Sequence, residues 1–240
     1  NDLVENSIYI KDNNNNDILD GNDYILFYAQ AANIWKYNNS QRIYEYHVHP
    51  YSKYNYYYLT TNAPYTTNKR INIKDISQQP NDTINTYTYC STIHNDVVNT
   101  HGSGRIWVGD KFSGAVPVRS YSLSIPNAVA NSNVNVRYAL ASISNANSSF
   151  DVTVNGATLT HSFYSGYRYP YQGLYYTTKP STSGKCEINI KYSSRESLAS
   201  GYLDYIEINA PARLVFTEGQ LKIKNSFNAN DSNISLFEIS

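Results

Sequence analysis

The sequence contains no methionine, not even at position 1, which indicates a processed product or a piece of a longer chain. No signal peptide is recognisable at its start. No stretch approaches the roughly 18 continuous apolar residues of a membrane-spanning helix, so no transmembrane segment is expected. The net charge is zero, with 19 basic and 19 acidic residues, which gives no electrostatic case for nucleic acid or an anionic membrane as the main partner.

Cysteine is scarce as well, since Cys90 and Cys186 are the only two in the chain and lie far apart in sequence. One long-range disulfide would suit an exported protein, because such bridges persist in oxidising compartments. Two free, buried thiols are at least as consistent with the sequence. Both alternatives stay open at this point.

Tyrosine, in contrast, is unusually abundant: the chain has 25 Tyr against 7 Phe and 2 Trp. Tyrosine suits a half-buried pleated surface, because its ring packs against the core while its hydroxyl reaches water. It equally suits sugar-binding and protein-binding surfaces. Asparagine is also frequent, which favours turns. At 240 residues the chain can build one large or two modest domains with sizeable cores.

The stretch from Phe150 to Leu159 gives the clearest structural signal. Phe150, Val152 and Val154 alternate with polar residues, which predicts a strand with one apolar face. The following Asn155-Gly156 pair tolerates positive φ, as a tight type I′ hairpin turn requires. An apolar face of this kind needs a second sheet to cover it.

Similar strands are predicted on both sides of this hairpin. Residues 121–125, 134–140 and 186–192 alternate strictly, whereas residues 202–209 alternate less cleanly, as a strand buried on both faces would. Polar turns separate these segments, and no stretch combines helical period with helix caps. The pattern is typical of an all-β protein with a jelly-roll or immunoglobulin-like β-sandwich and little helix.

The first third of the chain is predicted to be a separate β-meander. Residues 24–29 read as a central strand, and short strands are expected near residues 7–10, 34–37, 42–48, 54–60 and 70–73. The best linker is Gln78 to Asp82. We therefore expect an N-terminal β-domain at 1–80, the sandwich at 81–215 and a β tail at 216–240, with short strands near residues 214–223 and 235–239.

Catalytic chemistry finds little support. Cys90 or Cys186 could act as a nucleophile with His94 or His101 as its base. Cys186, however, falls on the apolar side of its strand, and Cys90 lies in mid-strand. His94 follows Cys90 by four residues, a spacing that fixes no geometry, so neither thiol is expected to be catalytic.

Paired side chains of other kinds are equally inconclusive. His47 and His49 share a strand face and could bind zinc, but no third ligand is evident and two solvated histidines are favoured. Asp204 and Glu207 are expected on opposite faces of their strand, so they do not form a glycosidase pair. We therefore expect neither a catalytic residue nor a metal ligand at these positions.

Two loops could bind a ligand. The loop from Asp12 to Asp17 is rich in oxygen ligands and could hold calcium, although it lacks EF-hand spacing and a solvated turn is favoured. The stretch from Tyr164 to Tyr176 is interpreted as a long aromatic loop at a sandwich edge. Its tyrosines could stack on a glycan or contact protein cargo, or fold back over the core; its arginine could meet a phosphate or carboxylate. The candidate binding residues are Tyr164, Tyr167, Arg168, Tyr169 and Tyr171.

Several of these segments also resemble a known family. Residues 23–30 (Asp-Tyr-Ile-Leu-Phe-Tyr-Ala-Gln), residues 35–37 (Trp-Lys-Tyr) and residues 56–60 (Tyr-Tyr-Tyr-Leu-Thr) resemble the N-terminal part of the PorU-type sortases. These are gingipain-like (family C25) cysteine peptidases of the Bacteroidetes type IX secretion system. Residues 94–99 and 104–112 resemble the next block, a Gly-x-x-Trp-x-Gly-acidic run with Asp110 where the family usually has Glu. Residues 152–156 and 202–206 complete a resemblance that spans about residues 8 to 240.

This resemblance implies that the peptidase domain would lie beyond Ser240 and is absent from this chain. The family's catalytic His is followed by Gly, as His101 is in this sequence, but His101 lies in the pre-catalytic block and its role is not transferred. Family membership implies cleavage of C-terminal secretion signals and attachment of cargo to surface lipopolysaccharide. The implied partners are the chain's own peptidase domain, type IX cargo proteins and lipopolysaccharide, at the bacterial outer-membrane surface.

The resulting hypothesis is a non-catalytic N-terminal region that positions the protease and holds cargo or glycan. The alternative is a free-standing carbohydrate-binding module, or a surface adhesin stabilised by calcium. The tyrosine loop and the sandwich pattern motivate that alternative.

Overall fold

The computed structural model describes residues 3–60, 68–72, 77–100, 102, 104, 107–164, 171–180, 184–224 and 234–240, without the side chains of residues 171 and 172. Its contacts divide the chain into two compact units. One unit holds residues 1–34 and 47–79, and the other holds residues 35–46 and 80–240. The described residues form strands and no helix, which confirms the all-β prediction.

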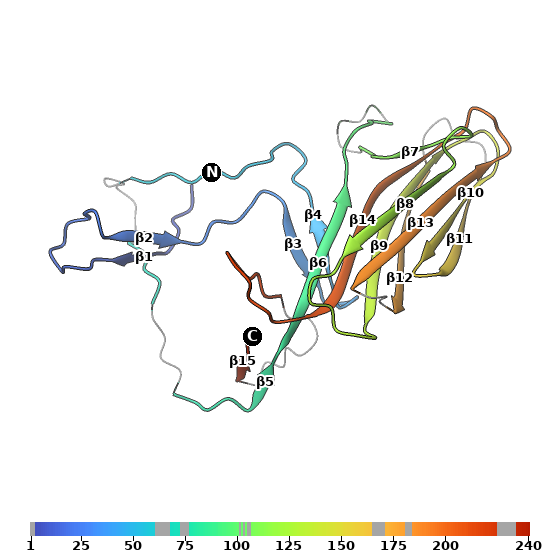
Figure 1. Ribbon diagram of the computed structural model, residues 1–240. Coiled ribbons are helices and arrows are strands. Elements are labelled where there is room, and N and C mark those ends of the chain that lie inside the picture. Colours follow the sequence, from blue (N-terminus) through green and yellow to red (C-terminus); the bar gives the residue numbers. More distant parts are fainter. Residues whose placement is uncertain are drawn as a thin grey trace. The chain divides into compact units, whose positions relative to one another are not determined.

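The strands in chain order are labelled in Figure 1: β1 (Ile8–Lys11), β2 (Tyr24–Phe27), β3 (Ile34–Asn38), β4 (Ile43–His47), β5 (Asp82–Ile84), β6 (Thr86–His94), β7 (Lys111–Phe112), β8 (Val118–Ser124), β9 (Asn133–Ile143), β10 (Ser148–Val154), β11 (Ala157–Phe163), β12 (Tyr171–Pro180), β13 (Lys185–Ser194), β14 (Ser200–Arg213) and β15 (Ser235–Phe237).

Eight strands of the larger unit form two antiparallel sheets that pack face to face (Figure 1). One sheet has the order β11-β10-β13-β8 and the other the order β12-β9-β14-β6, with the short β7 beside β14. The chain crosses repeatedly from one sheet to the other, so that β13 lies between β8 and β10 while β14 lies between β6 and β9. Eight strands connected in this way form a jelly roll, which confirms the predicted sandwich.

The core lies between the two sheets and is built from alternate residues of each strand. Val134, Val136, Tyr138 and Leu140 of β9 have no exposed side-chain surface. Phe150 of β10 is also fully buried, and the rings of Phe112, Phe163 and Tyr192 lie 4.8 to 5.6 Å from its centroid. This alternation of buried and outward residues is why the period-2 pattern identified these strands from the sequence.

The hairpin between β10 and β11 has the predicted turn. Asn155 and Gly156 take φ values of 46° and 84°, the positive φ at both central positions of a type I′ turn. The Asn155 amide also donates to the carbonyl of Pro180 at 2.6 Å, and its Oδ1 accepts from the backbone N–H of Glu187 at 2.8 Å. This asparagine therefore ties the hairpin to two neighbouring strands.

Strand β14 carries a β-bulge between Leu203 and Tyr205. Leu203 and Ile206 both pack in the core, so Asp204 and Tyr205 between them turn to the outer face of the sheet. Glu207, the neighbour of Ile206, also faces outward. The prediction that Asp204 and Glu207 occupy opposite faces is therefore wrong, because the bulge inserts one extra residue between them.

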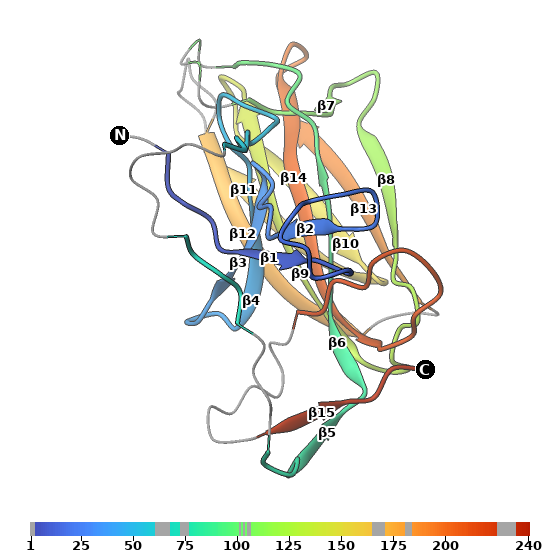
Figure 2. The same ribbon diagram turned by 90° about the vertical axis from the view of Figure 1, so that its left-hand side faces the viewer.

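The hairpin of β3 and β4 covers the outer face of the β12-β9-β14-β6 sheet (Figure 2). The backbone N–H of Tyr44 donates to the side chain of Asn209 at 2.6 Å, and Asn209 donates back to the Tyr44 carbonyl at 2.8 Å. Arg137 of β9 ion-pairs with Glu207 of β14 at 2.9 Å and with Glu45 of β4 at 3.7 Å. Strand β14 is therefore buried on both faces, as its irregular alternation predicted.

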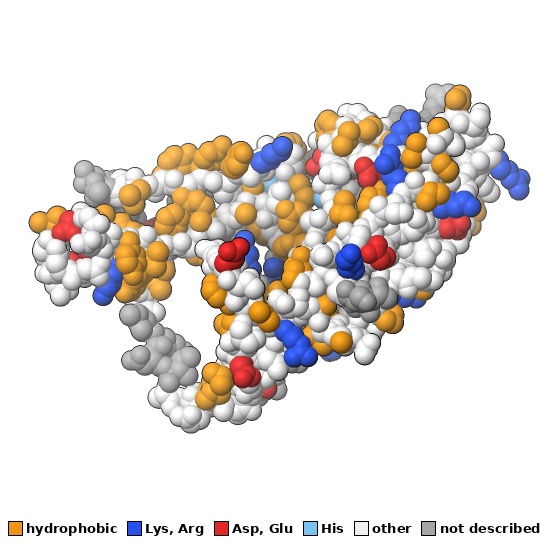
Figure 3. Space-filling model, viewed as in Figure 1, with side chains coloured by type: hydrophobic (Ala, Val, Ile, Leu, Met, Phe, Trp, Pro, Cys, Tyr) orange, Lys and Arg blue, Asp and Glu red, His pale blue; other side chains and the backbone are white. Residues whose placement is uncertain are grey.

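The smaller unit is built around the β1–β2 hairpin, in which Ile8 pairs with Phe27. The ring of Tyr57 lies 5.5 Å from that of Phe27, and its hydroxyl donates to the carbonyl of Gln30 at 2.9 Å. None of this unit's described residues is fully buried, and hydrophobic side chains gather on its surface (Figure 3). Residues 24–29 are therefore not the predicted central strand, because no second layer of described residues covers them.

Other differences from the sequence prediction concern strand positions. Residues 54–60 and the described residues of 214–223 form no strand. The sequence predicts a loop for the aromatic stretch at residues 164–176. Residues 171–176 of this stretch instead belong to β12, which pairs with β9 over ten residues. Tyr175 explains the difference: its ring stacks on His161 at a centroid distance of 3.5 Å and packs against the core, so it acts as a strand residue.

The two compact units meet between residues 79 and 80, where a domain boundary was predicted, but residues 35–46 lie in the larger unit and residues 216–240 are not separated from the sandwich. Residues 35–46 belong with the sandwich, because Tyr44 and Glu45 are bonded to β14 and β9. Strand β15 pairs in parallel with β5, which connects residues 235–237 to residues 82–84. Whether residues 1–80 fold independently stays a prediction.

Candidate functional site

Neither cysteine lies in an environment that activates its thiol. Cys186 is fully buried in the sandwich core, and burial raises the pKa of its thiol to about 12. Cys90 faces outward from β6, where its sulfur lies 3.7 Å from Oδ1 of Asn209, and burial raises its pKa to about 12 as well. Both thiols are free. A thiol must lose its proton to act as a nucleophile, so neither environment activates its cysteine.

The histidine considered as a base for Cys90 points to other partners. Cys90 and His94 are four residues apart on β6, which separates their Cα atoms by about 13 Å at about 3.3 Å per residue. Nε2 of His94 instead lies 3.1 Å from Asp96 and 3.5 Å from Asp204. The other candidate base, His101, lies outside the described residues. The described part of the chain therefore brings no thiol and imidazole together.

The His47 and His49 pair gains no third ligand from the part of the chain that the structure describes. Nδ1 of His49 accepts the backbone N–H groups of Tyr51 and Ser52, at 3.2 and 2.9 Å. One of its two nitrogens is thus engaged in closing a turn. This is a structural role for His49, and the absence of zinc at His47 and His49 stays a prediction.

The asparagine-rich loop is organised by hydrogen bonds to a carboxylate. Asp12 accepts the backbone N–H groups of Asn14, Asn15 and Asp17, and these bonds lower its pKa. Asp20 accepts the side-chain amides of Asn14 and Asn16. The Asp12 carboxylate thus faces backbone amide donors of its own loop. Calcium binding at residues 12–17 stays a prediction.

Of the five tyrosine-loop residues singled out from the sequence, the structure fully describes one. Tyr164 follows β11, is 80% exposed and lines an open depression of about 470 Å³. Tyr167, Arg168 and Tyr169 lie outside the described residues. Tyr171 begins β12, and its side chain is not described. The binding role of all five therefore stays a prediction.

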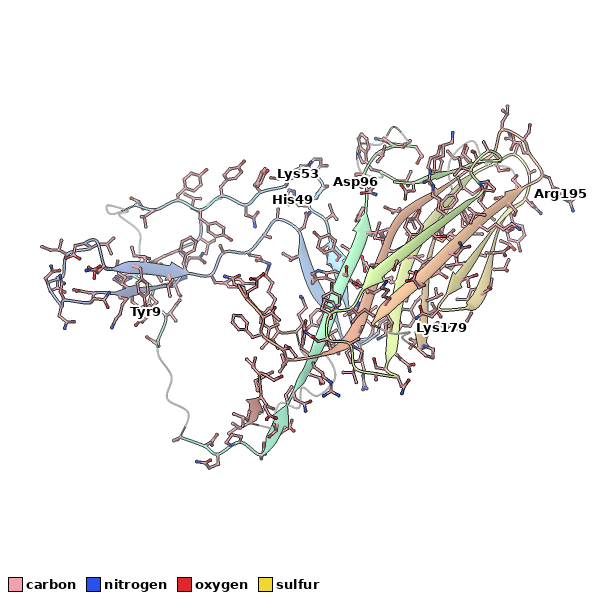
Figure 4. The ribbon with its side chains drawn as sticks, in the orientation of Figure 1. Tyr9, His49, Lys53, Asp96, Lys179 and Arg195 are labelled. Atoms are coloured by element: carbon pink, nitrogen blue, oxygen red, sulfur yellow. The ribbon has the colours of Figure 1, made fainter. Side chains whose placement is uncertain are left out.

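The depression beside Tyr164 lies at one end of the sandwich, where β10, β11 and β13 meet. Its lining is rich in hydroxyl groups and includes one arginine, Arg195, which projects from this end of the sandwich (Figure 4). Serine hydroxyls both donate and accept hydrogen bonds, and an exposed tyrosine offers a ring for stacking. The lining residues are Asn147, Ser148, Ser149, Ser162, Phe163, Tyr164, Ser193, Ser194 and Arg195.

A second cluster lies on the outer face of the β12-β9-β14-β6 sheet. It combines His94 at the end of β6, Asp96 just beyond it (Figure 4) and Asp204 in the bulge of β14. One nitrogen or oxygen atom from each residue lies within 4.8 Å of the others, the only such group of three or more metal-binding side chains among the described residues. Burial raises the pKa of Asp204 to about 6; the charge of His94 opposes this rise and that of Asp96 adds to it.

Sequence reasoning identified His94 but assigned it to a thiol, and it missed Asp204 as its neighbour. The residues are 110 positions apart, and β6 and β14 become neighbours only in the folded sheet. The one available signal was the interrupted alternation near residue 204. A bulge produces such an interruption, and so does a strand that is buried on both faces.

Charges elsewhere on the sandwich are mixed. Basic and acidic side chains are interspersed on the face visible in Figure 3, in keeping with the zero net charge. No helix among the described residues is long and apolar enough to cross a membrane.

No family model matches the sequence, and no curated protein matches it. Two carbohydrate-binding modules are among the solved structures that match. A CBM36 module in complex with calcium and xylotriose gives a TM-score of 0.32 at 21% identity, over 50% of this chain and 87% of the module. The CBM36-1 domain of a multidomain xylanase, from the hindgut metagenome of Trinervitermes trinervoides, gives 0.32 at 15% identity, over 51% and 94%. These TM-scores are too low to establish a common fold.

The structure is also similar to dimeric latent PorU from Porphyromonas gingivalis, with a TM-score of 0.67 at 15% sequence identity. The match covers 93% of this chain and 21% of the PorU chain, so this chain spans about a fifth of that protein's length. This chain therefore shares a PorU-like fold over nearly all of its residues.

Proposed function

We propose that this chain is the non-catalytic N-terminal region of a PorU-like cysteine peptidase of the bacterial outer-membrane surface, where it positions the peptidase domain. The observation that carries the proposal is the TM-score of 0.67 to PorU over 93% of the chain. The smaller compact unit makes up about a quarter of the residues, so this coverage includes parts of both units. A shared sandwich alone would not produce a match of that extent.

The environments of the thiols support a non-catalytic role for this region. Cysteine peptidases need a thiolate beside a base, whereas Cys90 and Cys186 have raised pKa values and His94 faces carboxylates. Under this proposal, the peptidase domain cleaves C-terminal secretion signals and attaches cargo to lipopolysaccharide. The N-terminal region holds that domain in place and contributes a surface for cargo or glycan.

The test uses a PorU-like peptidase from which the equivalent N-terminal region has been deleted. We expect the purified chain to bind this truncated enzyme in size-exclusion chromatography and to restore its turnover of a secretion-signal peptide. The chain alone should leave the peptide intact. Absence of both binding and restoration would contradict the positioning role. Turnover by the chain alone, abolished by Cys90→Ser, would contradict the non-catalytic role.

A second candidate function, carbohydrate binding or surface adhesion, is favoured by the hydroxyl-rich depression beside Tyr164. A glycan array with the whole chain tests it. We expect bound glycans, if this function is correct, to be lost in Tyr164→Ala and Arg195→Gln but retained in Tyr51→Ala, which removes another exposed tyrosine. Binding to no glycan, or binding unaffected by the first two variants, would eliminate the candidate.

A further inference from the structure

We propose that His94, Asp96 and Asp204 form a binding site for a divalent transition-metal ion, with zinc the best match to these donor groups. The site lies on the outer face of the sandwich, at the edge where the end of β6 meets the bulge of β14. It is independent of the positioning role proposed above.

Two carboxylates converge on one ring nitrogen. Nε2 of His94 lies 3.1 Å from Oδ1 of Asp96 and 3.5 Å from Oδ1 of Asp204. An imidazole nitrogen carries at most one proton, so a single hydrogen bond to Asp96 satisfies it. The second carboxylate has no function in that hydrogen bond, whereas a metal ion at the centre would use all three groups.

The charges of the cluster also favour a cation. Asp96 and Asp204 are held within 4.8 Å of each other at their oxygen atoms. In the part of the chain that the structure describes, no lysine or arginine forms an ion pair with either carboxylate. Two like charges at this separation repel each other, more strongly where the site is partly desolvated. A bound cation removes this repulsion.

Nε2 is the nitrogen of His94 that would bind the ion. Nδ1 of His94 is buried and has no hydrogen-bond partner among the described residues. Since Nε2 faces both carboxylates, a metal ion would bind there and the ring proton would stay on Nδ1.

The two separations measured from Nε2 agree with the coordination shell of zinc. Zinc binds histidine nitrogen and carboxylate oxygen at about 2.0–2.2 Å in tetrahedral geometry, which places neighbouring donors roughly 3.3–3.6 Å apart. The observed separations of 3.1 and 3.5 Å from Nε2 lie close to that value. Three protein ligands would leave the fourth position to water. Calcium prefers six to eight oxygen ligands, so a histidine in the group favours a transition metal.

The backbone holds these groups in place without an ion. The bulge at Leu203 and Tyr205 directs Asp204 outward. The segment after His94 is fixed by the bridge between Val98 and Val108. Asp96 remains 47% exposed, which leaves a path for an ion to enter. The site is therefore preformed and open to solvent.

The expected affinity is moderate. Metal-binding histidines usually donate their second N–H to an acceptor, and removal of such partners costs about 10–100-fold in affinity. Nδ1 of His94 has no such acceptor among the described residues, and the site offers three protein ligands. We therefore expect a Kd for zinc on the order of 1 µM or weaker, against the far tighter four-ligand structural sites.

The experiment is calorimetric titration of the whole chain with zinc chloride, combined with NMR of the histidine rings. We expect one equivalent of zinc to bind, and the ring of His94 to shift more than those of the other histidines. Asp204→Asn and His94→Gln should each weaken binding by at least about tenfold. A His47→Gln/His49→Gln variant should bind normally, because it removes the other histidine pair and leaves the cluster intact.

Folding of the variants is checked by circular dichroism. Because Asp204→Asn removes one of two repelling charges, we expect it to leave the metal-free melting temperature unchanged or higher, so that lost binding reflects a lost ligand. Three results would overturn the proposal: no zinc binding, zinc binding unchanged in Asp204→Asn, or zinc binding lost only in the His47/His49 variant. Calcium binding in place of zinc would refute the assignment of the metal.

Discussion

Replacement of Arg137 by methionine tests the structure most directly. The guanidinium lies 2.9 Å from the carboxylate of Glu207, whose side chain is only 1% exposed, and 3.7 Å from that of Glu45. Burial raises the pKa of Glu207, and the charge of Arg137 and its hydrogen bond oppose that rise. The Arg137→Met variant therefore leaves a buried carboxylate without its cation beneath the β3–β4 hairpin.

The expected loss is large. Removal of one partner of a buried ion pair typically costs about 3–5 kcal/mol. Arg137 keeps 16% of its side chain exposed, so water partly screens the site. The loss in the free energy of unfolding should therefore be about 3 kcal/mol. Arg137→Met with Glu207→Gln removes both charges, and we expect it to recover most of this loss because no charge of the pair then stays buried.

The loss should also depend on pH, with a definite sign. The folded-state pKa of Glu207 lies above its ordinary value of 4.5, and without Arg137 it must rise further. The folded state then binds the proton more tightly than the unfolded state. Lowering the pH through the raised pKa toward 4.5 should therefore restore part of the stability of Arg137→Met. The same change should affect the double variant much less.

The assay is urea denaturation followed by far-ultraviolet circular dichroism, at about pH 7 and about pH 5, which follows the change in stability as the pH falls. Arg213→Met is the matched control, since Arg213 is an exposed arginine at the end of β14, and it should change stability by less than about 0.5 kcal/mol. A loss of less than about 1 kcal/mol for Arg137→Met, or a loss that grows as the pH falls, would refute the account of Glu207 as a buried anion.

Three further predictions concern packing, turn geometry and the thiols. Gly201→Ala should destabilise the sandwich by about 1–3 kcal/mol, because an added Cβ would lie within 3 Å of two core aromatic rings; Gly114→Ala, with no atom within 4 Å, should be close to neutral in the same denaturation assay. Gly156→Ala should cost about 1 kcal/mol and lower the melting temperature, because φ is 84° there; an unchanged melting temperature would contradict the turn. Cys90 and Cys186 should resist Ellman's reagent under mildly alkaline conditions until denaturant is added, because burial raises both pKa values to about 12; rapid reaction of either thiol in the native protein would contradict the structure.

The sandwich could be predicted from the sequence because its core strands alternate strictly. Every second side chain lies in the core along residues 134–140 and 150–154. This arrangement produces the period of two seen in the sequence. Asn155-Gly156 marked its turn for an equally local reason. Strand β12 was missed because its tyrosines and glycine resemble a loop, and only pairing with β9 along its full length makes it a strand.

The outer-face residues could not be predicted, since they depend on pairing between distant segments. A one-residue bulge at Leu203 reverses the alternation, so that residues before and after it no longer share one pattern of inward and outward faces. A strand without that bulge would place Asp204 and Glu207 on opposite faces. The partner of Asn209 is Tyr44, 165 residues earlier, in a segment that the sequence assigned to another domain.

The bulge also explains why the outer face carries two acidic clusters with different chemistry. Tyr205 lies between them: its ring packs 5.7 Å from that of His94 on one side and 5.2 Å from the guanidinium of Arg137 on the other. Glu207 lies on the Arg137 side and is neutralised there. Asp204 lies on the His94 side with a second carboxylate and, among the described residues, no basic ion-pair partner except that imidazole. A fold stabilised mainly by its core needs neither cluster. The first serves to fix the β3–β4 hairpin to the sheet, and the unbalanced charge of the second is the reason to look there for a bound cation.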